Sequence, residues 1–349
     1  MLAAASFADG PYVVRDANDA LVALSVDSAP GGSVKRAEPL QPDATLTIAA
    51  VGDVPSFTVQ LRPKAPPAIN TLGASKKTPL FVVADTHGEY EALVRMLQAH
   101  GVIGPALRWS FGGGRLLILG DVFDRGPNHL EILWLLYQLE AEATAAGGGV
   151  HLLLGNHETM VMMGDLRYLH EKYVETARVL GTEYYRLFDK GSVLGQWLRS
   201  KPAVMKVGRQ LFLHAGISRT LVERKLSLGY INTMIRLTLS GTLDDESRDL
   251  ARLLMTTDGP LWYRGFFAEH RDFTTATSDD VDAALKHFAV DRIFVGHTIV
   301  PTITSLFDGR VIALNVPAKP DAPDSDFEAL LLRGGKTLRA KLDGTLEPL

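Results

Sequence analysis

The chain has 349 residues, a formal net charge of −4 and no cysteine. Its length accommodates one large catalytic domain and a small accessory one, and the acidic balance argues against nucleic acid as a partner bound through a broad basic surface. Without cysteine, disulfide scaffolds, thiolate zinc sites and enzymes built on a cysteine nucleophile are all excluded.

The N-terminus leaves the compartment open. Residues 1–9 are small and apolar but lack a basic segment, and Ser6-Phe7-Ala8 resembles the small-x-small pattern of signal-peptide cleavage sites. A trimmed signal peptide and an irregular terminus are both compatible with this stretch, so the protein is expected in either the cytoplasm or the periplasm. No apolar run reaches the roughly 20 residues that a membrane span requires.

Residues 1–75 differ in composition from the rest of the chain. Short β-type runs, separated by Asp, Asn, Gly and Pro, predict a small antiparallel β unit. The runs are Tyr12–Val14, Ala20–Leu24, Thr45–Ile48 and Phe57–Leu61. The proline-containing segment 63–77 is typical of a linker. We therefore expect an accessory domain at 1–75 and a catalytic domain at 76–349. Because so small a unit has a marginal core, it is expected to support the catalytic domain rather than to act as an independent docking module.

From Pro79 onward, strands of the buried type alternate with helical segments. The expected strands are Leu80–Ala84, Leu116–Leu119, Val150–Leu154, Leu211–Leu213 and Arg292–Val295. Helices are expected near 90–97 and at Leu130–Leu139, with further helical segments at Leu166–Leu198 and Leu221–Leu254, and β-rich sequence after His297. This order predicts an α/β layered fold.

Each of the five strands is followed by polar residues beside a glycine. In chain order these motifs are Asp85-Thr86-His87-Gly88, Gly120-Asp121-Val122-Phe123-Asp124-Arg125-Gly126, Gly155-Asn156-His157-Glu158, His214-Ala215-Gly216 and Gly296-His297-Thr298. Because ligands bind at the carboxyl ends of strands in α/β folds, the motifs are expected to converge on one crevice. Their oxygen and imidazole donors suit divalent Mn, Fe or Zn, and two such ions about 3.5–4 Å apart form a clamp for displacement at phosphorus.

Each motif alone has an ordinary structural explanation. An Asp-x-His after a strand is commonly a turn or a helix start, and Gly-Asn-His-Glu can simply lead into a helix. Two acids and an arginine in one loop are harder to explain, because they need a cation or a substrate to pair with. The conjunction of all five, using four of the ten histidines, favours a metal site. The remaining histidines are expected at surface or packing positions: His100, His129, His151, His170, His270 and His287.

At these residues the sequence resembles the calcineurin-like metallophosphoesterase superfamily, over roughly 79–316. Asp124-Arg125-Gly126 and His214-Ala215-Gly216 resemble its phosphoprotein phosphatase branch, and Gly296-His297-Thr298 resembles bacterial and Shewanella-like members, as does 259–264. The resemblance implies a four-layer α/β/β/α sandwich with helical insertions. It also implies two divalent metal ions, with manganese expected and iron or zinc as alternatives.

The resemblance assigns a role to each matching residue. Asp85 and His87 would bind the first metal, and Asp121 would bridge both. The ligands that complete the second metal site would be Asn156, His214 and His297. A hydroxide that bridges the two metals would attack phosphorus in line.

The resemblance also implies four further residues of the catalytic site. His157, oriented by Asp124, would protonate the leaving oxygen as the general acid. Arg125 would hold phosphate oxygens with its planar guanidinium. Arg264 is either a second phosphate clamp or part of a packed lid.

The sequence departs from the family pattern at three positions. Ala84 replaces the usual glycine before the first aspartate, and Ile299 replaces the second histidine found in many phosphodiesterases, which speaks against nuclease-like members. Asn315 stands where relatives often carry aspartate, and this leaves the role of its loop open.

The resulting hypothesis is a phosphatase that hydrolyses phosphomonoesters, on proteins (Ser/Thr or Tyr) or on small molecules. A dinucleoside polyphosphate or nucleotide hydrolase would use the same metal motifs and is the rival enzyme. A non-catalytic phosphate-sensing protein is disfavoured, because such proteins normally lose a ligand or the acid and this chain keeps both. The sequence predicts no oligomeric state.

Overall fold

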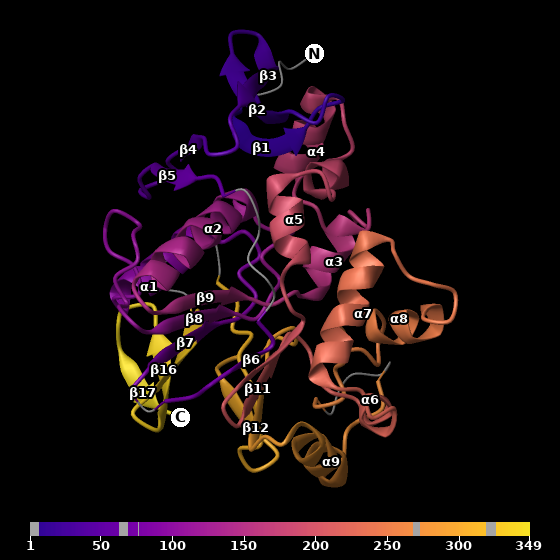
Figure 1. Ribbon diagram of the computed structural model, residues 1–349. Helices are drawn as coiled ribbons and strands as arrows, with labels where there is room; N and C mark the ends of the chain where they lie inside the picture. The colour runs from indigo at the N-terminus through magenta and orange to yellow at the C-terminus, as the bar shows by residue number, and fades with distance from the viewer. Residues whose placement is uncertain (1–6, 63–68, 76, 268–272, 319–325) are drawn as a thin grey trace.

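The computed structural model describes residues 7–62, 69–75, 77–267, 273–318 and 326–349 (Figure 1). Two six-stranded sheets form its centre, and helices lie on their outer sides. This arrangement confirms the predicted α/β/β/α sandwich. The N-terminal stretch up to Ser6 and the expected surface position of His270 lie outside the described residues.

The first sheet has the order β17-β16-β15-β7-β8-β9. Its strands are β7 (Leu80–Val83), β8 (Arg115–Ile118), β9 (Gly149–Leu152), β15 (Glu328–Arg333), β16 (Lys336–Lys341) and β17 (Leu346–Pro348). The neighbours β7, β8 and β9 are parallel, whereas the C-terminal strands join antiparallel. Every residue of β7 is buried, as expected for a strand covered on both faces.

The second sheet has the order β13-β14-β12-β11-β10-β6. Its strands are β6 (Thr71–Leu72), β10 (Val204–Val207), β11 (Gln210–Leu213), β12 (Arg292–Val295), β13 (Thr304–Leu306) and β14 (Val311–Ala313). Strands β11, β12 and β14 run parallel, so β11 and β12 end at the same edge. Two of the five motif-bearing strands therefore belong to a different sheet from the other three.

Helices cover both sheets, and two helical segments extend beyond them. Over the first sheet lie α1 (Tyr90–Ala99) and α2 (His129–Ala145), with α2 packed on β9. The predicted segment at 166–198 contains α4 (Glu171–Leu180), the 3-10 helix η1 (Tyr184–Phe188) and α5 (Val193–Arg199). The remaining helices are α3 (Asn156–Met162), α6 (Arg219–Glu223), α7 (Leu228–Ser240), α8 (Arg248–Leu254) and α9 (Ser278–Phe288).

The N-terminal β unit packs against the helical segment at 166–198. It contains a three-stranded antiparallel sheet and a separate hairpin. The strands are β1 (Asp9–Arg15), β2 (Leu21–Ala29), β3 (Gly32–Leu40), β4 (Thr45–Ile48) and β5 (Phe57–Gln60). Helix α4 contacts β2 and β3, α5 contacts β1, and the unit's buried side chains join the same hydrophobic cluster as the large domain. The unit therefore shares its core with the large domain, and its role as a supporting element stays a prediction.

The segment predicted as a linker contributes a strand to the catalytic core. Thr71–Leu72 forms β6 and pairs with Lys206–Val207 of β10. The second sheet therefore begins inside the region assigned to the accessory domain, a few residues before the expected boundary at 75. Among the described helices, none combines the length and apolar character needed to cross a bilayer.

Candidate active site

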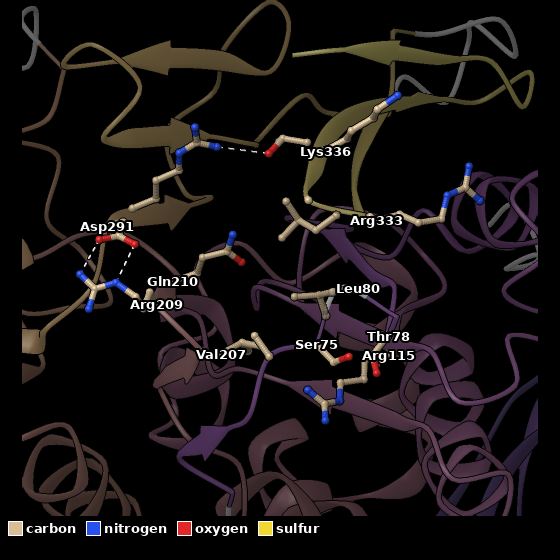
Figure 2. A pocket seen from close by; sticks show the side chains of 16 residues that line it. Ser75, Thr78, Leu80, Arg115, Val207, Arg209, Gln210, Asp291, Arg333 and Lys336 are labelled. Carbon is tan, nitrogen blue, oxygen red and sulfur yellow. Dashed lines mark hydrogen bonds and ion pairs between the residues drawn. The ribbon is translucent and has the colours of Figure 1, made fainter.

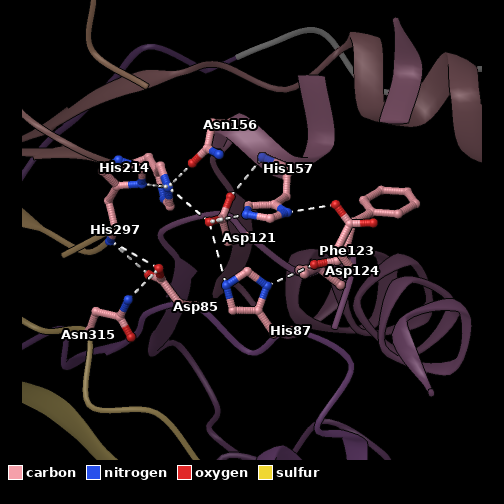
Figure 3. A network of polar contacts seen from close by, with 12 residues as sticks. Asp85, His87, Asp121, Phe123, Asp124, Asn156, His157, His214, His297 and Asn315 are labelled. Carbon is pink, nitrogen blue, oxygen red and sulfur yellow. Dashed lines mark hydrogen bonds and ion pairs between the residues drawn. The ribbon is translucent and has the colours of Figure 1, made fainter. Parts of the chain in front are cut away.

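The five predicted motifs meet where the two sheets present the carboxyl ends of their parallel strands (Figure 3). Strands β7, β8 and β9 bring one motif each from the first sheet. Strands β11 and β12 bring His214 and His297 from the second sheet, across the seam between them. The convergence inferred from sequence is therefore present, although it joins two sheets and not one.

The backbone at this seam is held in an uncommon conformation. Twelve described non-glycine residues have positive φ, and half of them belong to the motifs. These are Asp85, His87, Asp121, Asp124, Arg125 and His297. Such conformations cost free energy and persist only where the surroundings enforce them, which is typical of functional sites.

Two glycines allow the carboxylates to approach the backbone closely. A Cβ atom on Gly155 would lie 2.2 Å from Oδ1 of Asp121, and one on Gly296 would lie 2.3 Å from Oδ1 of Asp85. Any side chain at these positions would displace a carboxylate, so glycine is required for the packing of the site.

Glu158 holds two of the motif loops together, a role that the sequence reasoning missed. Its side chain is completely buried, and Oε2 accepts hydrogen bonds from the backbone N–H groups of Asp121 (2.8 Å) and Gly155 (2.6 Å). Oε1 accepts from Val122 (2.7 Å). The Gly-Asn-His-Glu motif carried this residue, but its acceptor role depends on backbone groups that only the fold places beside it.

Asp121 lies at the centre of the cluster. Its Oδ2 is 3.2 Å from Nε2 of His214 and 3.7 Å from Nε2 of His87. Among the described residues, two groups have ligand atoms within 4.8 Å of one another, and Asp121 belongs to both. The groups are His87-Asp121-His157 and Asp121-His214-His297. A carboxylate shared by two neighbouring groups is the arrangement expected of a residue that bridges two cations.

The orientation of the histidine rings fits a cation. Nδ1 of His87 contacts the carbonyl oxygen of Phe123 (2.8 Å), and Nδ1 of His214 contacts that of Leu119 (2.9 Å). A ring that donates through Nδ1 presents the lone pair of Nε2 to the cluster, as metal-binding histidines do.

The donor set around His214 would be unfavourable without positive charge. Its Nε2 lies 2.9 Å from Oδ1 of Asn156 and 3.1 Å from Nδ1 of His297. When His214 donates through Nδ1, its Nε2 offers a lone pair, as do Oδ1 of Asn156 and one nitrogen of neutral His297, and Nε2 of His297 is buried without a hydrogen-bond partner among the described residues. Divalent cations held by these atoms would satisfy them.

Negative charge around Asp121 favours a proton on His214, whereas burial lowers the pKa of His87 to about 4 and holds that of His297 well below its usual range. Burial would raise the pKa of Asp121, but the charges of His214 and His157 outweigh it and hold this pKa well below its usual range. Burial would lower the pKa of His214, yet Asp121 and Asp85 raise it to about 9. A bound cation would replace the proton that His214 otherwise carries.

Asp85 occupies the edge of the cluster. Its carboxylate accepts from the backbone N–H of His297 (3.1 and 3.0 Å) and from Nδ2 of Asn315 (2.7 Å). Burial raises its pKa to about 7. It belongs to neither ligand-atom group, and its assignment as a metal ligand, like those of the other predicted ligands, stays a prediction. Asn315, whose role the sequence left open, positions this carboxylate.

His157 and Asp124 form a tight buried pair beside the cluster. Nδ1 of His157 is 2.6 Å from Oδ2 of Asp124, and both side chains are almost completely buried. Burial would lower the pKa of His157, but Asp121 and Asp124 outweigh it and raise this pKa. The two carboxylates therefore favour a proton on this ring, and Asp124 leaves its Nε2 free to face the cluster.

The two predicted arginines lie at the border of the site. Arg264 donates to Oγ1 of Thr298 (3.0 Å) and to the carbonyl of His297 (3.3 Å), so it is fixed next to a predicted ligand. Arg125 is exposed, and its backbone N–H donates to the carbonyl of Tyr168 (3.1 Å). The half-exposed ring of Tyr168 lies 5.3 Å from that of His157, which places an aromatic surface beside this histidine.

A separate hollow of about 430 Å³ lies at the opposite ends of the strands (Figure 2). Several cationic side chains line it, but Arg209 is paired with Asp291 and Arg292 donates to Thr337. The charged ends of Arg333 and Lys336 point away from its middle. The cationic side chains of the hollow therefore do not converge on one position where a ligand could bind, whereas the polar side chains around Asp121 do.

Comparison with known proteins agrees with this geometry. The family model described as calcineurin-like phosphoesterase matches residues 78–301. The fold is similar to the crystal structure of the cold-active protein-tyrosine phosphatase of a psychrophilic Shewanella species, with a TM-score of 0.84, 32% identity and coverage of 99% of this chain and 100% of that one. Shewanella-like protein phosphatase 2 of Arabidopsis thaliana is 26% identical, over 74% of this chain and 76% of its own. A symmetrical bis(5'-nucleosyl)-tetraphosphatase of Methylococcus capsulatus is 28% identical, over 77% and 93%.

Proposed function

The chain belongs to the calcineurin-like phosphoesterase family and is a metal-dependent phosphatase, and from this premise we propose that it dephosphorylates phosphoproteins at Ser/Thr or Tyr. The observation that carries the proposal is the His157–Asp124 pair, at 2.6 Å, beside the donors grouped around Asp121. A phosphate held at the cluster would have its leaving oxygen within reach of a protonated imidazole.

The metal ions would be held by the residues that surround Asp121. Together with Asp85, the proposed ligands are His87, Asp121, Asn156, His214 and His297. When bound, two divalent cations neutralise phosphate charge and lower the pKa of water. We propose manganese for both positions, with iron or zinc as alternatives, because mixed oxygen and imidazole donors suit all three.

The chain's own residues would complete the reaction. Because Nδ1 of His157 is engaged by Asp124, the proton reaches the leaving oxygen from Nε2, while water attacks phosphorus from the opposite side. Arg125 and Arg264 would bind the phosphate oxygens and offset the charge that develops on them.

Two observations favour a protein substrate. Tyr168 and Ile299 are exposed apolar side chains next to His157 and to His297-Thr298, so the rim offers a surface for the residue that carries the phosphate. The similar proteins include protein phosphatases, and the Shewanella structure among them is named a protein-tyrosine phosphatase. The similarity to a dinucleoside tetraphosphatase keeps nucleotide hydrolysis as the second candidate.

The experiment compares substrates with the metal-loaded protein. Phosphate release would be measured from matched phosphoserine, phosphothreonine and phosphotyrosine peptides and from a dinucleoside tetraphosphate, with metal content determined on the same sample. We expect the phosphopeptides to be preferred, and a preference for the dinucleotide would refute the proposal. The His157→Asn variant is the control, since it should keep its metals and lose about 10²–10⁴-fold in kcat.

A further inference from the structure

A second buried polar cluster lies behind the catalytic loop, outside the metal site. We call it the anchor cluster; it comprises Asp9, Tyr12, His129, Lys172, Tyr173, Thr176 and Tyr184. These residues come from β1, α2, α4 and η1, so the cluster joins the N-terminal β unit to the helical segment at 166–198 and to the large domain. Most of its side chains are buried, and none of its members belongs to the two ligand-atom groups around Asp121.

Asp9 is the acid at the centre of the anchor cluster. Its side chain has no exposed surface, and Oδ2 accepts from the hydroxyls of Tyr12 (2.6 Å) and Thr176 (2.7 Å). Its Oδ1 lies 3.0 Å from Nζ of Lys172. A buried carboxylate needs these partners to offset its charge and so constrains each of them, and Lys172 also lies 3.5 Å from Oε1 of Glu131.

Lys172 and Tyr173 transmit this position to the catalytic loop. Nζ of Lys172 donates to the carbonyl oxygen of Pro127 (2.8 Å), and the hydroxyl of Tyr173 donates to the same oxygen (2.7 Å). Pro127 comes directly after Asp124-Arg125-Gly126. These two hydrogen bonds to one carbonyl oxygen therefore hold the end of the loop that carries Asp124 and Arg125.

A second connection reaches the same loop through the rings. The hydroxyl of Tyr12 lies 3.3 Å from that of Tyr184, which in turn contacts Nε2 of His129 (2.6 Å). The His129 ring stacks on Tyr173, with centroids 3.8 Å apart, and packs against Phe123 at 4.8 Å. Phe123 is adjacent to Asp124 in the chain.

We propose that Asp9 is a positioning residue for the phosphatase reaction: it holds Lys172 directly, and Tyr173 through its contact with Thr176 on the same helix, against Pro127, and thereby sets the place of Asp124 and Arg125. The proposal rests on the proposed function, because it takes these two loop residues as catalytic. The N-terminal β unit then contributes to catalysis through the loop, without contacting the substrate.

The general acid provides a readout that a purely structural role would not change. A displaced Asp124 would misalign His157, and the damage should grow as the leaving group becomes poorer and depends more on protonation. For Asp9→Asn we expect the loss of kcat/KM on phenyl phosphate to exceed that on p-nitrophenyl phosphate by about tenfold. The dependence of log kcat/KM on leaving-group pKa should be steeper than in the wild type.

Matched variants separate positioning from general destabilisation. Asp27→Asn is the control, since Asp27 is a partly exposed acid of the same sheet that pairs with Arg36 (3.3 Å); it should leave the leaving-group dependence unchanged. Tyr173→Phe removes one donor to Pro127 and keeps the ring on His129, so it decides the question if Asp9→Asn does not fold. If Asp9→Asn folds and its kcat/KM depends on leaving-group pKa as in the wild type, the proposal is overturned. If Asp9→Asn does not fold, the same result in Tyr173→Phe overturns it.

An activity-independent measurement distinguishes failure of this inference from failure of the proposed function. Hydrogen exchange of the peptide 121–130 should be faster in Asp9→Asn than in the wild type and in Asp27→Asn. A wild type that releases no phosphate from these esters or from the phosphopeptides would refute the proposed function alone, and the exchange rates would still decide on Asp9. Equal exchange in all three proteins would show that Asp9 does not hold the loop.

Discussion

Glu158→Gln tests how the loops around Asp121 are held together. The two carboxylate oxygens of Glu158 accept hydrogen bonds from four backbone N–H groups, at 2.8 Å from Asp121, 2.6 Å from Gly155, 2.7 Å from Val122 and 3.4 Å from Phe123. In glutamine one oxygen becomes an NH₂ group, so two amide donors lose their acceptor whichever way the side chain turns.

The expected cost follows from these contacts. A buried donor left without an acceptor costs about 1–3 kcal/mol, so two of them would cost about 2–6 kcal/mol. Burial and the neighbouring Asp121 raise the pKa of Glu158, and removing its charge relieves part of that repulsion. We therefore expect the free energy of unfolding to fall by about 2–3 kcal/mol, the lower part of this range.

Urea unfolding and metal titration measure the two consequences. Besides the loss of stability, metal affinity should fall about 10–100-fold, as is usual when residues that orient metal ligands are changed. Glu171→Gln is the control, because this exposed residue should shift stability by no more than about 0.5 kcal/mol. A Glu158→Gln protein with the wild-type urea midpoint and the wild-type metal affinity would refute the reasoning.

Three further predictions concern the metal cluster and its rim. Because the pKa of His214 is raised to about 9 in the folded protein, the stability that its proton contributes is fully present below the unfolded pKa of about 6.5 and is lost as the pH rises through 9. A metal ion that displaces this proton should therefore release protons between about pH 7 and 9. Calorimetry in buffers of different ionisation enthalpy measures this release. Gly296→Ala would push a Cβ to 2.3 Å from Oδ1 of Asp85, and should weaken metal binding at least about tenfold by titration. Tyr168→Ala should raise KM for phosphopeptides about threefold to tenfold and leave metal content unchanged, since its half-exposed ring borders His157 without belonging to the ligand groups.

The sequence was most informative where chemistry and local structure coincide. Asp121 and His297 each follow a predicted buried strand after a single glycine, so the motif, the strand and the direction of the crevice could all be predicted from a few residues. The helical segment at 166–198 was likewise visible in its periodicity, and the structure places α4, η1 and α5 there.

What the sequence missed depends on contacts between distant segments. Strand β10 and helix α9 are too short or too polar to stand out, and Thr71–Leu72 becomes a strand only because β10 offers it an edge. The division of the motif strands between two sheets is a matter of strand order, which no local pattern encodes. Glu158 and Asn315 act through a backbone or a carboxylate that the fold brings from elsewhere in the chain.

The seam between the sheets gives the metal ions a mechanical role. Asp121 belongs to the first sheet and His214 and His297 to the second, and their polar atoms meet across the boundary with Asp121 3.2 Å from His214. Divalent ions bound there would link the two sheets of the sandwich to each other. Removing the metal ions with a chelator should therefore abolish activity and also let the two sheets separate more readily. Proteolysis of the metal-free protein should then be faster than that of the metal-loaded protein.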